Sequence, residues 1–289
     1  MLRDWNYHLR EWGSPVEGEA PLVLVHGWMD VGASWQFMVD AMAGNRWIVA
    51  PDWRGYGQTT SPGARPDAYW FPDYLADLDA LLDQLSPGAP VDLVGHSMGG
   101  NVAMMYAGVR PDRIRRLVNL EGFGLPATRP AQAPTRLAQW LDEIRALRRG
   151  DMDLKTYDSA DGVAGRLMKT NPRLGADKAS WLARHWAAPD ADGRWAVLGD
   201  AAHKVINPQL YRVDEALAIY ARIAAPVLSV VANEDSLGQW WKGQFTLDEY
   251  RERLRHVPRL TEACIDDAGH MLHHDQPERL ANLIEDFLR

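Results

Sequence analysis

The chain has 289 residues, which exceeds the usual size of one domain but suits a single α/β core that carries an insertion. Apolar residues make up 46% of the sequence and charged residues 24%, so the chain can bury a substantial core and is not a disordered protein. The formal net charge of -8 disfavours nucleic-acid binding, because phosphates are neutralised by clustered Lys and Arg.

The only cysteine, Cys264, excludes an intrachain disulfide and cannot by itself supply a metal site. It lies in an apolar stretch, and we expect a buried structural thiol. The N-terminal stretch lacks the layout of a secretory signal, and no run of about eighteen apolar residues occurs. We therefore expect a cytoplasmic protein without a membrane span, either a monomer or a homodimer.

Short apolar runs alternate along the chain with longer helical patterns, as in strand-helix units that build a mostly parallel sheet. Residues 5–12 alternate in character and predict an antiparallel edge strand. The apolar runs are too short for helices and are closed by turn residues, so we predict buried central strands. These strands are 22–25, 47–50, 91–94, 117–120 and 227–231.

Helical patterns lie between and after these strands. Leucines at helical spacing predict a helix over 73–85, and a further helix is expected over 101–108. Thr246 and Glu249 form a capping-box pattern that opens a helix to about residue 255. Residues 277–288 have a proline in the first turn and an apolar face, which predicts a closing amphipathic helix.

The strand pattern disappears between about residues 126 and 210, where helical and proline-broken segments follow one another. We predict that 126–210 form a helical cap. Residues 1–125 and 211–289 then form one core. The predicted fold class is α/β, with a mostly parallel central sheet flanked by helices.

The strongest chemical signal is Gly95-His96-Ser97-Met98-Gly99, a G-x-S-x-G that follows a predicted strand and precedes a predicted helix. A nucleophile at such a sharp turn needs neighbours without side chains, because the backbone is strained and crowded. The serine hydroxyl then projects above the sheet, beside a helix N-terminus that favours negative charge. The sequence therefore predicts Ser97 as a nucleophile.

Acyl transfer also needs preorganised donors for an oxyanion, and backbone amides serve this purpose. His26-Gly27-Trp28 follows the first central strand, where a loop can face Ser97. We assign the oxyanion hole to the amides of Trp28 and Met98. The side chain of His26 is expected only to brace the loop.

A serine hydroxyl is a poor nucleophile until an imidazole takes its proton. His270 lies on a loop between a late strand and the last helix, where its side chain can reach back over the sheet edge. We predict His270 as the general base. His273 and His274 are weaker choices.

A carboxylate is needed to orient the histidine and to stabilise the imidazolium. Asp235 follows the strand 227–231 and gives the chain order serine, acid, histidine, so it is preferred. Glu121, at the end of the strand 117–120, stays open as the alternative acid.

Large aromatic side chains near these loops favour an apolar or aromatic small-molecule substrate. Trp53 and Tyr56, in a second strand-end loop, are further candidates for the mouth of the pocket. Most of the 13 tryptophans are nevertheless expected to pack the cap onto the core. The predicted substrate-binding residues are Trp28, His96, Phe123, Trp140 and Trp240.

Taken together, HGWMD at 26, DWRGYGQT at 52, GHSMGG at 95, ANED at 232 and DDAGHMLHHDQPE at 266 resemble the α/β-hydrolase superfamily. LEGFG at 120 and HKVINPQLYRVDEA at 203 resemble its serine hydrolase-like proteins and carboxylesterases. The resemblance implies a cap over the pocket and neither a metal nor an organic cofactor. Haloalkane dehalogenases and soluble epoxide hydrolases are similar, but they place an aspartate where Ser97 stands.

A serine nucleophile gives an acyl-enzyme, so the expected substrates are esters, thioesters, lactones or amides. We therefore predict a carboxylesterase-like serine hydrolase. Two alternatives stay open. One is a ligand-sensing receptor on a hydrolase scaffold, and the other is a lyase or perhydrolase that uses the same triad.

Overall fold

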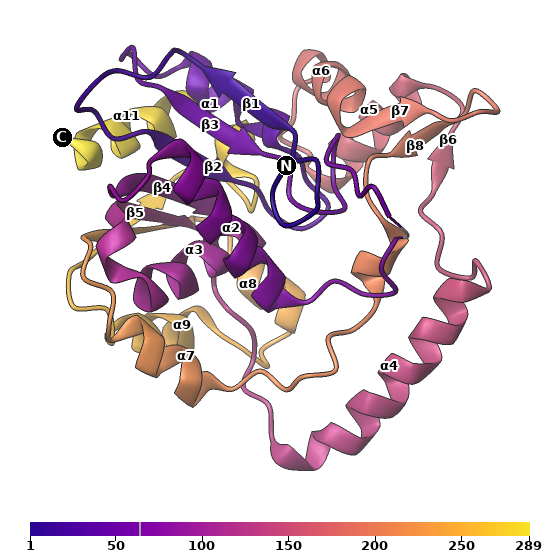
Figure 1. The fold of residues 1–289 in the computed structure, drawn as a ribbon. Coiled ribbons are helices and arrows are strands. Elements are labelled where there is room, and N and C mark those ends of the chain that lie inside the picture. The colour runs from indigo at the N-terminus through magenta and orange to yellow at the C-terminus, as the bar shows by residue number, and fades with distance from the viewer. Residues whose placement is uncertain (64) are drawn as a thin grey trace.

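The computed structural model describes residues 1–63 and 65–289. Its centre is a seven-stranded sheet in the order β1-β3-β2-β4-β5-β9-β10 (Figure 1). Only β1 is antiparallel to its neighbour in this sheet, as the described pairings show. The strands are β1 (Leu9–Trp12), β2 (Leu22–Val25), β3 (Ile48–Pro51), β4 (Val91–His96), β5 (Ile114–Leu120), β9 (Val227–Ala232) and β10 (Leu260–Ile265).

The predicted central strands are confirmed to within a few residues, and so is the antiparallel edge strand. The strands β2, β3 and β4 are buried along their whole length. Helices cover both faces of a parallel sheet, and such strands therefore read as continuous apolar runs. This is why the strands could be recognised from the sequence.

Two apolar layers enclose the sheet. One layer includes residues of α2 (Phe71–Leu85), α3 (Met98–Val109) and α9 (Leu247–Leu254). The other includes residues of α1 (Gln36–Asp40) and α11 (Pro277–Leu288). The remaining core helices are α7 (Val213–Tyr220), α8 (Ser236–Trp241) and α10 (Leu272–Asp275).

The segment between β5 and α7 differs from the expected all-helical cap, because it also contains a small antiparallel sheet. This sheet has the order β6-β8-β7. Short turns around Gly193 allow two brief strands to pair where helical segments had been expected. The elements are α4 (Ala133–Arg148), β6 (Thr156–Tyr157), α5 (Ala160–Thr170), α6 (Ala176–Trp186), β7 (Ala187–Pro189) and β8 (Trp195–Val197).

The two halves of this insertion are packed differently. Side chains of α5 and α6 form a core of their own against Phe37. In contrast, α4 has no buried residue and lies apart from the sheet in Figure 1. The predicted cap boundaries, 126–210, remain a prediction.

Two further expectations concern exposure. Cys264 is exposed and not buried as expected, because β10 is an edge strand and Cys264 points away from the core. Of the helices that the structure describes, none has the length and apolar character needed to cross a membrane.

Candidate active site

Ser97 occupies the turn between β4 and α3, with a positive φ of 54°. A Cβ atom added to Gly95 would lie 2.4 Å from the carbonyl oxygen of Gly99, and one added to Gly99 would lie 2.3 Å from the carbonyl oxygen of Val25. No side chain fits at either position. The glycines of the motif therefore permit the strained conformation that places the serine at the turn.

The loop after β2 packs against this turn. A Cβ atom on Gly27 would lie 3.1 Å from the Cβ atom of Ser97. The loop is braced by His26, whose Nε2 accepts a hydrogen bond of 2.9 Å from the backbone N–H of Trp53. Burial lowers the pKa of His26 to about 4, so the imidazole is neutral and can accept this bond. His26 thus has the bracing position that the sequence suggested.

His270 lies on the loop that follows β10, and its side chain is 19% exposed. Its backbone carbonyl accepts a hydrogen bond of 2.8 Å from Nε2 of His96, the residue before Ser97. The rings of His96 and His270 lie 4.7 Å apart between centroids. The loop that carries His270 is therefore tied directly to the end of β4.

Among the residues that the structure describes, Glu121 is the carboxylate that contacts His270. Nδ1 of His270 lies 3.2 Å from Oε2 of Glu121. Glu121 follows β5 with a φ of 55° and is buried. The backbone N–H of Ala232 donates to Oε1 at 2.7 Å, and the hydroxyl of Ser236 donates to Oε2.

The sequence favoured Asp235 over Glu121, but the described contacts of His270 include Glu121 and not Asp235. Asp235 is exposed and caps the N-terminus of α8, where its Oδ1 accepts a hydrogen bond of 2.7 Å from the backbone N–H of Gly238. Aspartate is common at this N-cap position because its carboxylate accepts a hydrogen bond from a free backbone N–H of the first helical turn. The alternative acid, Glu121, takes the place beside His270. Ser236, whose hydroxyl donates to Glu121, was not among the residues predicted from the sequence.

Burial acts in opposite directions on this pair. Desolvation raises the pKa of Glu121 to about 7, although the hydrogen bonds from Ser236 and Ala232 oppose the shift. Desolvation also lowers the pKa of His270 to about 3. The imidazole is therefore neutral at neutral pH, as a general base requires.

Two of the predicted substrate-binding residues lie on the surface beside these groups. Trp240 is 50% exposed, and its ring meets the His270 ring edge to face at 4.1 Å. Trp28 is 53% exposed, and its indole N–H donates to the carbonyl of His203 at 3.2 Å. Their exposed faces are available to an apolar ligand.

Several other predicted pocket residues are buried. His96 packs between Trp35, His270 and His273, which speaks against a direct substrate contact. Trp53 and Tyr56 are core residues and not part of a cavity mouth.

Phe123 is also buried and packs edge to face on Tyr250, although it borders a small cavity beside Glu121. Like Trp53 and Tyr56, Phe123 is buried because the loop at the end of its strand folds inward. The sequence alone did not reveal this packing.

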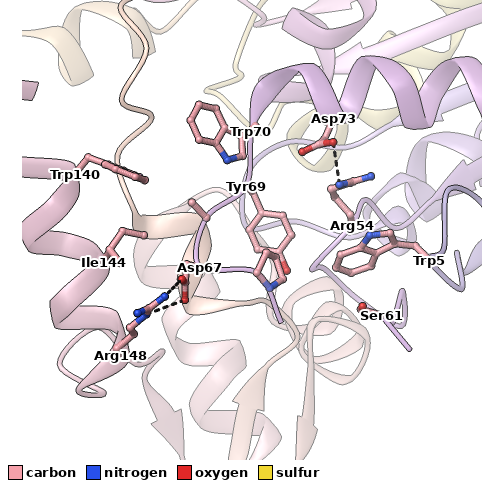
Figure 2. Close-up of a pocket in the computed structure, with 12 residues that line it drawn as sticks. Trp5, Arg54, Ser61, Asp67, Tyr69, Trp70, Asp73, Trp140, Ile144 and Arg148 are labelled. Atoms are coloured by element: carbon pink, nitrogen blue, oxygen red, sulfur yellow. Dashed lines mark hydrogen bonds and ion pairs between the residues drawn. The ribbon is translucent and has the colours of Figure 1, made fainter. Parts of the chain in front are cut away.

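Trp140 belongs to a different place. It lines a cavity of about 560 Å³ between α4 and the loop before α2, and neither Ser97 nor His270 lines this cavity (Figure 2). The cavity is bordered by Tyr69 and by an ion pair between Arg148 and Asp67. The structure therefore does not bring Trp140 together with the candidate active site.

The candidate oxyanion donors flank Ser97. Met98 is the first residue of α3, so its N–H is one of those without an acceptor inside the helix. Trp28 follows Gly27, which lies against Ser97. Both positions suit backbone amides that face a group bound at the serine. Their role remains a prediction.

Comparisons with known proteins show which family shares this fold. Residues 20–277 match the family model described as alpha/beta hydrolase fold. A serine hydrolase-like protein of Danio rerio is 27% identical over 284 residues, which covers 96% of this chain and 83% of that protein. A cis-3-alkyl-4-alkyloxetan-2-one decarboxylase of Shewanella oneidensis is 28% identical over 94% of this chain and 82% of that protein.

Solved structures with the same fold include a hypothetical protein of Pseudomonas aeruginosa, with a TM-score of 0.84 and 25% identity over 100% of this chain and 96% of that one. A thioesterase domain from the curacin biosynthetic pathway has a TM-score of 0.79 and 25% identity over 96% of this chain and 95% of that one. The match to the family model spans most of the chain, and with the strained serine turn on a mostly parallel sheet it shows that the protein belongs to the α/β-hydrolase fold family and is a hydrolase.

Proposed function

We propose that the protein is a serine hydrolase that cleaves a carboxylic ester, or a related thioester or lactone, through an acyl-enzyme. Ser97 is the nucleophile, His270 the general base and Glu121 the acid. The observation that carries the proposal is the strained turn at Ser97, next to a loop on which His270 is hydrogen-bonded to a buried carboxylate. These are the parts that acyl transfer to a serine requires.

The reaction follows from these positions. Nε2 of His270 takes the hydroxyl proton as Ser97 attacks the acyl carbonyl. Glu121 holds the Nδ1–H of the imidazole and stabilises the positive charge that forms on the ring. The amides of Trp28 and Met98 bind the oxyanion, and the imidazolium then protonates the leaving alcohol. Water activated by the same histidine releases the acid from Ser97.

An apolar or aromatic group is the expected substrate feature beside the scissile bond. The exposed ring of Trp240 offers apolar surface close to His270, and the exposed ring of Trp28 stands on the loop whose Gly27 lies against Ser97. Burying an apolar group contributes on the order of 1.5 to 3 kcal/mol, which is enough to select among acyl chains.

The names of similar proteins support an acyl-transfer reaction. A structure titled as a thioesterase domain is among the close structural matches. Structures titled as esterases of Mycobacterium tuberculosis and Thermogutta terrifontis share the fold at lower identity. We propose by analogy that an activated acyl carbonyl is attacked here.

A second candidate function is supported by one comparison. The Shewanella oneidensis relative is named as a decarboxylase of a substituted oxetan-2-one, which is a four-membered lactone. A lyase reaction on such a ring would release carbon dioxide and an alkene, whereas hydrolysis would give a β-hydroxy acid. Product analysis with a β-lactone separates the two reactions.

The decisive experiment compares the wild type with Ser97→Ala on p-nitrophenyl esters of graded chain length and on lactones. We expect kcat/KM of the variant to fall by at least about 10³-fold, because the nucleophile is lost. Ser61→Ala, at a partly exposed position, is the matched control, and the Tm of both variants checks the fold. Undiminished turnover in Ser97→Ala would refute the proposed mechanism. Ligand binding by the wild type without any turnover would instead favour the receptor alternative.

A further inference from the structure

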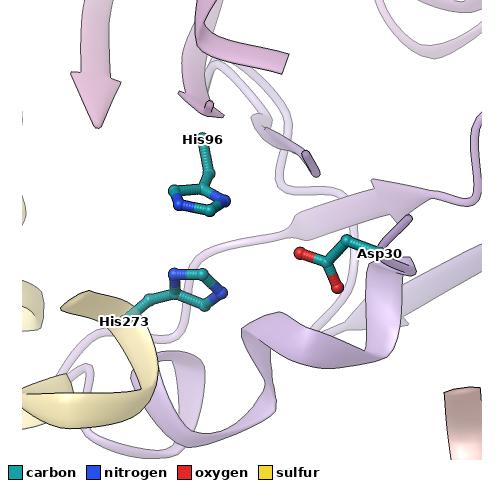
Figure 3. A group of neighbouring side chains, drawn as sticks. All are labelled: Asp30, His96 and His273. Carbon is teal, nitrogen blue, oxygen red and sulfur yellow. The ribbon is translucent and has the colours of Figure 1, made fainter. Parts of the chain in front are cut away.

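Three side chains with metal-binding atoms meet beneath the candidate active site. Asp30, His96 and His273 are all buried, and their candidate ligand atoms lie within 4.8 Å of one another. They come from the loop after β2, the end of β4 and the helix α10. Figure 3 shows the imidazole of His96 next to that of His273, with the Asp30 carboxylate directed toward the space beside them. The ring centroids lie 4.6 Å apart, and the angle between the ring planes is 60°.

The free atoms in this cluster are unusual for a protein interior. Oδ2 of Asp30, Nδ1 of His96 and both ring nitrogens of His273 have no hydrogen-bond partner among the described residues. A buried polar atom without a partner costs about 1 to 3 kcal/mol, so several in one place need an explanation. One atom from each of the three residues belongs to the cluster, and a bound ion would satisfy these three atoms together.

The tautomer of His96 fits a metal ligand. Its Nε2 lies 2.8 Å from the backbone carbonyl of His270, and a carbonyl can only accept, so the proton is on Nε2. Burial lowers the pKa of His96 well below its usual value, so the ring is neutral. Nδ1 therefore carries a free lone pair. A metal-bound histidine commonly donates its other N–H to a carbonyl in this way.

Gly27 lies close to this nitrogen. A Cβ atom on Gly27 would lie only 3.1 Å from Nδ1 of His96, so a side chain there would crowd the nitrogen. The same glycine packs against Ser97. The cluster therefore lies directly behind the nucleophile turn.

Asp30 is held with one oxygen bound and the other free. Its Oδ1 accepts a hydrogen bond of 2.7 Å from the backbone N–H of Val31 and another from the hydroxyl of Ser34. The Ser34 hydroxyl in turn accepts a hydrogen bond of 2.8 Å from the indole N–H of Trp186. This chain of contacts fixes the carboxylate and leaves Oδ2 for a ligand, as the outer contacts of a metal site do.

His273 can complete the set. Its ring packs on Trp35, with centroids 4.8 Å apart and an angle of 34° between the planes. Nitrogen ligands bind Zn²⁺ at roughly 2.0 to 2.1 Å, so the three donors must approach one another more closely than they do here. For His273 such an approach breaks no hydrogen bond to any described residue, because neither ring nitrogen has one.

We propose that Asp30, His96 and His273 form a binding site for one divalent transition-metal ion of the Zn²⁺ or Co²⁺ type. Two imidazoles and one carboxylate favour such ions over Mg²⁺ and Ca²⁺, which prefer ligand sets made of oxygen atoms. The ion acts as a structural link. It joins the loop after β2, the end of β4 and α10, and through Nε2–H of His96 it steadies the loop that carries His270.

The test uses the full-length protein, stripped with a chelator and also refolded in the presence of the metal, since the site is buried. Zn²⁺ or Co²⁺ is added, and the bound metal is quantified by mass spectrometry after dialysis. We expect one equivalent of metal, a visible d–d absorption band for bound Co²⁺ and a higher Tm. None of these measurements depends on the proposed hydrolase reaction.

Two variants locate the ion. Asp30→Asn keeps the acceptor for Val31 and Ser34 but replaces the free carboxylate oxygen with an amide nitrogen, and His273→Gln removes one imidazole. Each should weaken binding of Co²⁺ by at least about tenfold. His274→Gln is the matched control, because His274 is the next residue and equally buried but lies outside the cluster.

Failure of the wild type to bind one equivalent of Zn²⁺ or Co²⁺ by either route overturns the proposal. Binding that stays unchanged in Asp30→Asn and His273→Gln also overturns it, because the metal then lies elsewhere. If one of the variants does not fold, the wild-type stoichiometry and the other variant still decide the question.

Discussion

Glu121 combines features that are rarely found together in a carboxylate without a function. It is buried, has a positive φ, accepts hydrogen bonds from Ala232 and Ser236, and lies 3.2 Å from His270. A strained backbone at a buried charged group is costly and is typical of active sites. The proposed chemistry depends on this carboxylate.

The first prediction compares the variant Glu121→Gln with the variant Asp235→Asn. Glu121→Gln should lower kcat by about 10² to 10⁴-fold, because the imidazolium loses its anionic partner. Asp235→Asn should leave kcat nearly unchanged, and asparagine still caps α8. Steady-state kinetics on the best ester checks this. The reverse pattern would return the acid to Asp235.

A second prediction concerns pH. Burial raises the pKa of Glu121 from 4.5 to about 7, so the carboxylate takes up a proton as the pH falls through about 7. The protonated acid no longer stabilises the imidazolium, and kcat/KM should therefore fall on the acid side of neutrality. The pKa of His270 lies near 3, so this histidine does not set that limb.

The measurement is a profile of kcat/KM between about pH 5 and pH 9. In Glu121→Gln the residual activity should lose the acid limb near neutrality, because the titrating group is gone. A wild-type profile that stays flat down to about pH 5 would contradict the assignment.

The turn from β4 to α3 depends on close contact between backbone atoms. A Cβ atom on Gly99 would lie 2.3 Å from the carbonyl oxygen of Val25 and 2.6 Å from that of His26, and backbone cannot move aside easily. The helix α3 can therefore approach β2 only because this position has no side chain. That close approach brings Ser97 and the loop at Gly27 together.

Gly99→Ala should lower the free energy of unfolding by about 2 kcal/mol or more, because the new methyl group overlaps the backbone of β2. Gly165→Ala in α5 is the control. Nothing lies within 4 Å of a Cβ atom there, and alanine should stabilise the helix by about 0.5 to 1 kcal/mol. Urea unfolding of both variants tests the pair of expectations, and similar stabilities would show that the overlap is relieved elsewhere.

At the scale of the whole molecule, the insertion is attached to the core unevenly. Arg173 forms an ion pair with Glu234, and Lys178 donates to the carbonyl of His274 at 2.9 Å. Both residues lie in the part of the insertion around α5 and α6. These contacts join that part to the loop that follows β9 and to the helix α10.

The helix α4 is different, because none of its residues is buried and Leu137 and Leu141 are 46% and 50% exposed. Its described links to the core are few and peripheral, such as the ion pair between Arg148 and Asp67. Exposed ion pairs contribute about 0 to 1 kcal/mol. Local opening of α4 should therefore cost much less than opening of α6.

We predict that backbone amides of α4 exchange with deuterium at least about tenfold faster than those of α6. Ala179, Leu182 and Ala183 are buried in α6 and protect its amides, whereas α4 has no such anchors. Hydrogen exchange followed by mass spectrometry resolves the two segments. Equal protection would mean that α4 is held by contacts other than those described.

The features of this protein that depend on neighbours along the chain could be predicted from its amino acids. Buried parallel strands appear as continuous apolar runs, and the last helix has a recognisable proline and apolar face. The turn at Ser97 is also local, because the glycines that make it possible stand beside the serine. The fold class and the candidate nucleophile could therefore be predicted.

The way in which distant segments meet could not be predicted, because it depends on packing in three dimensions. Glu121 and Asp235 both follow parallel strands, and the sequence does not say which one turns toward His270 and which one caps a helix. The burial of His96 and the separation of Trp140 from Ser97 likewise depend on loops that pack across the sheet edge. The reason is physical: side-chain direction at a strand end is set by the backbone dihedral angles of the loop and by what packs against it, and neither is encoded in the spacing of residues.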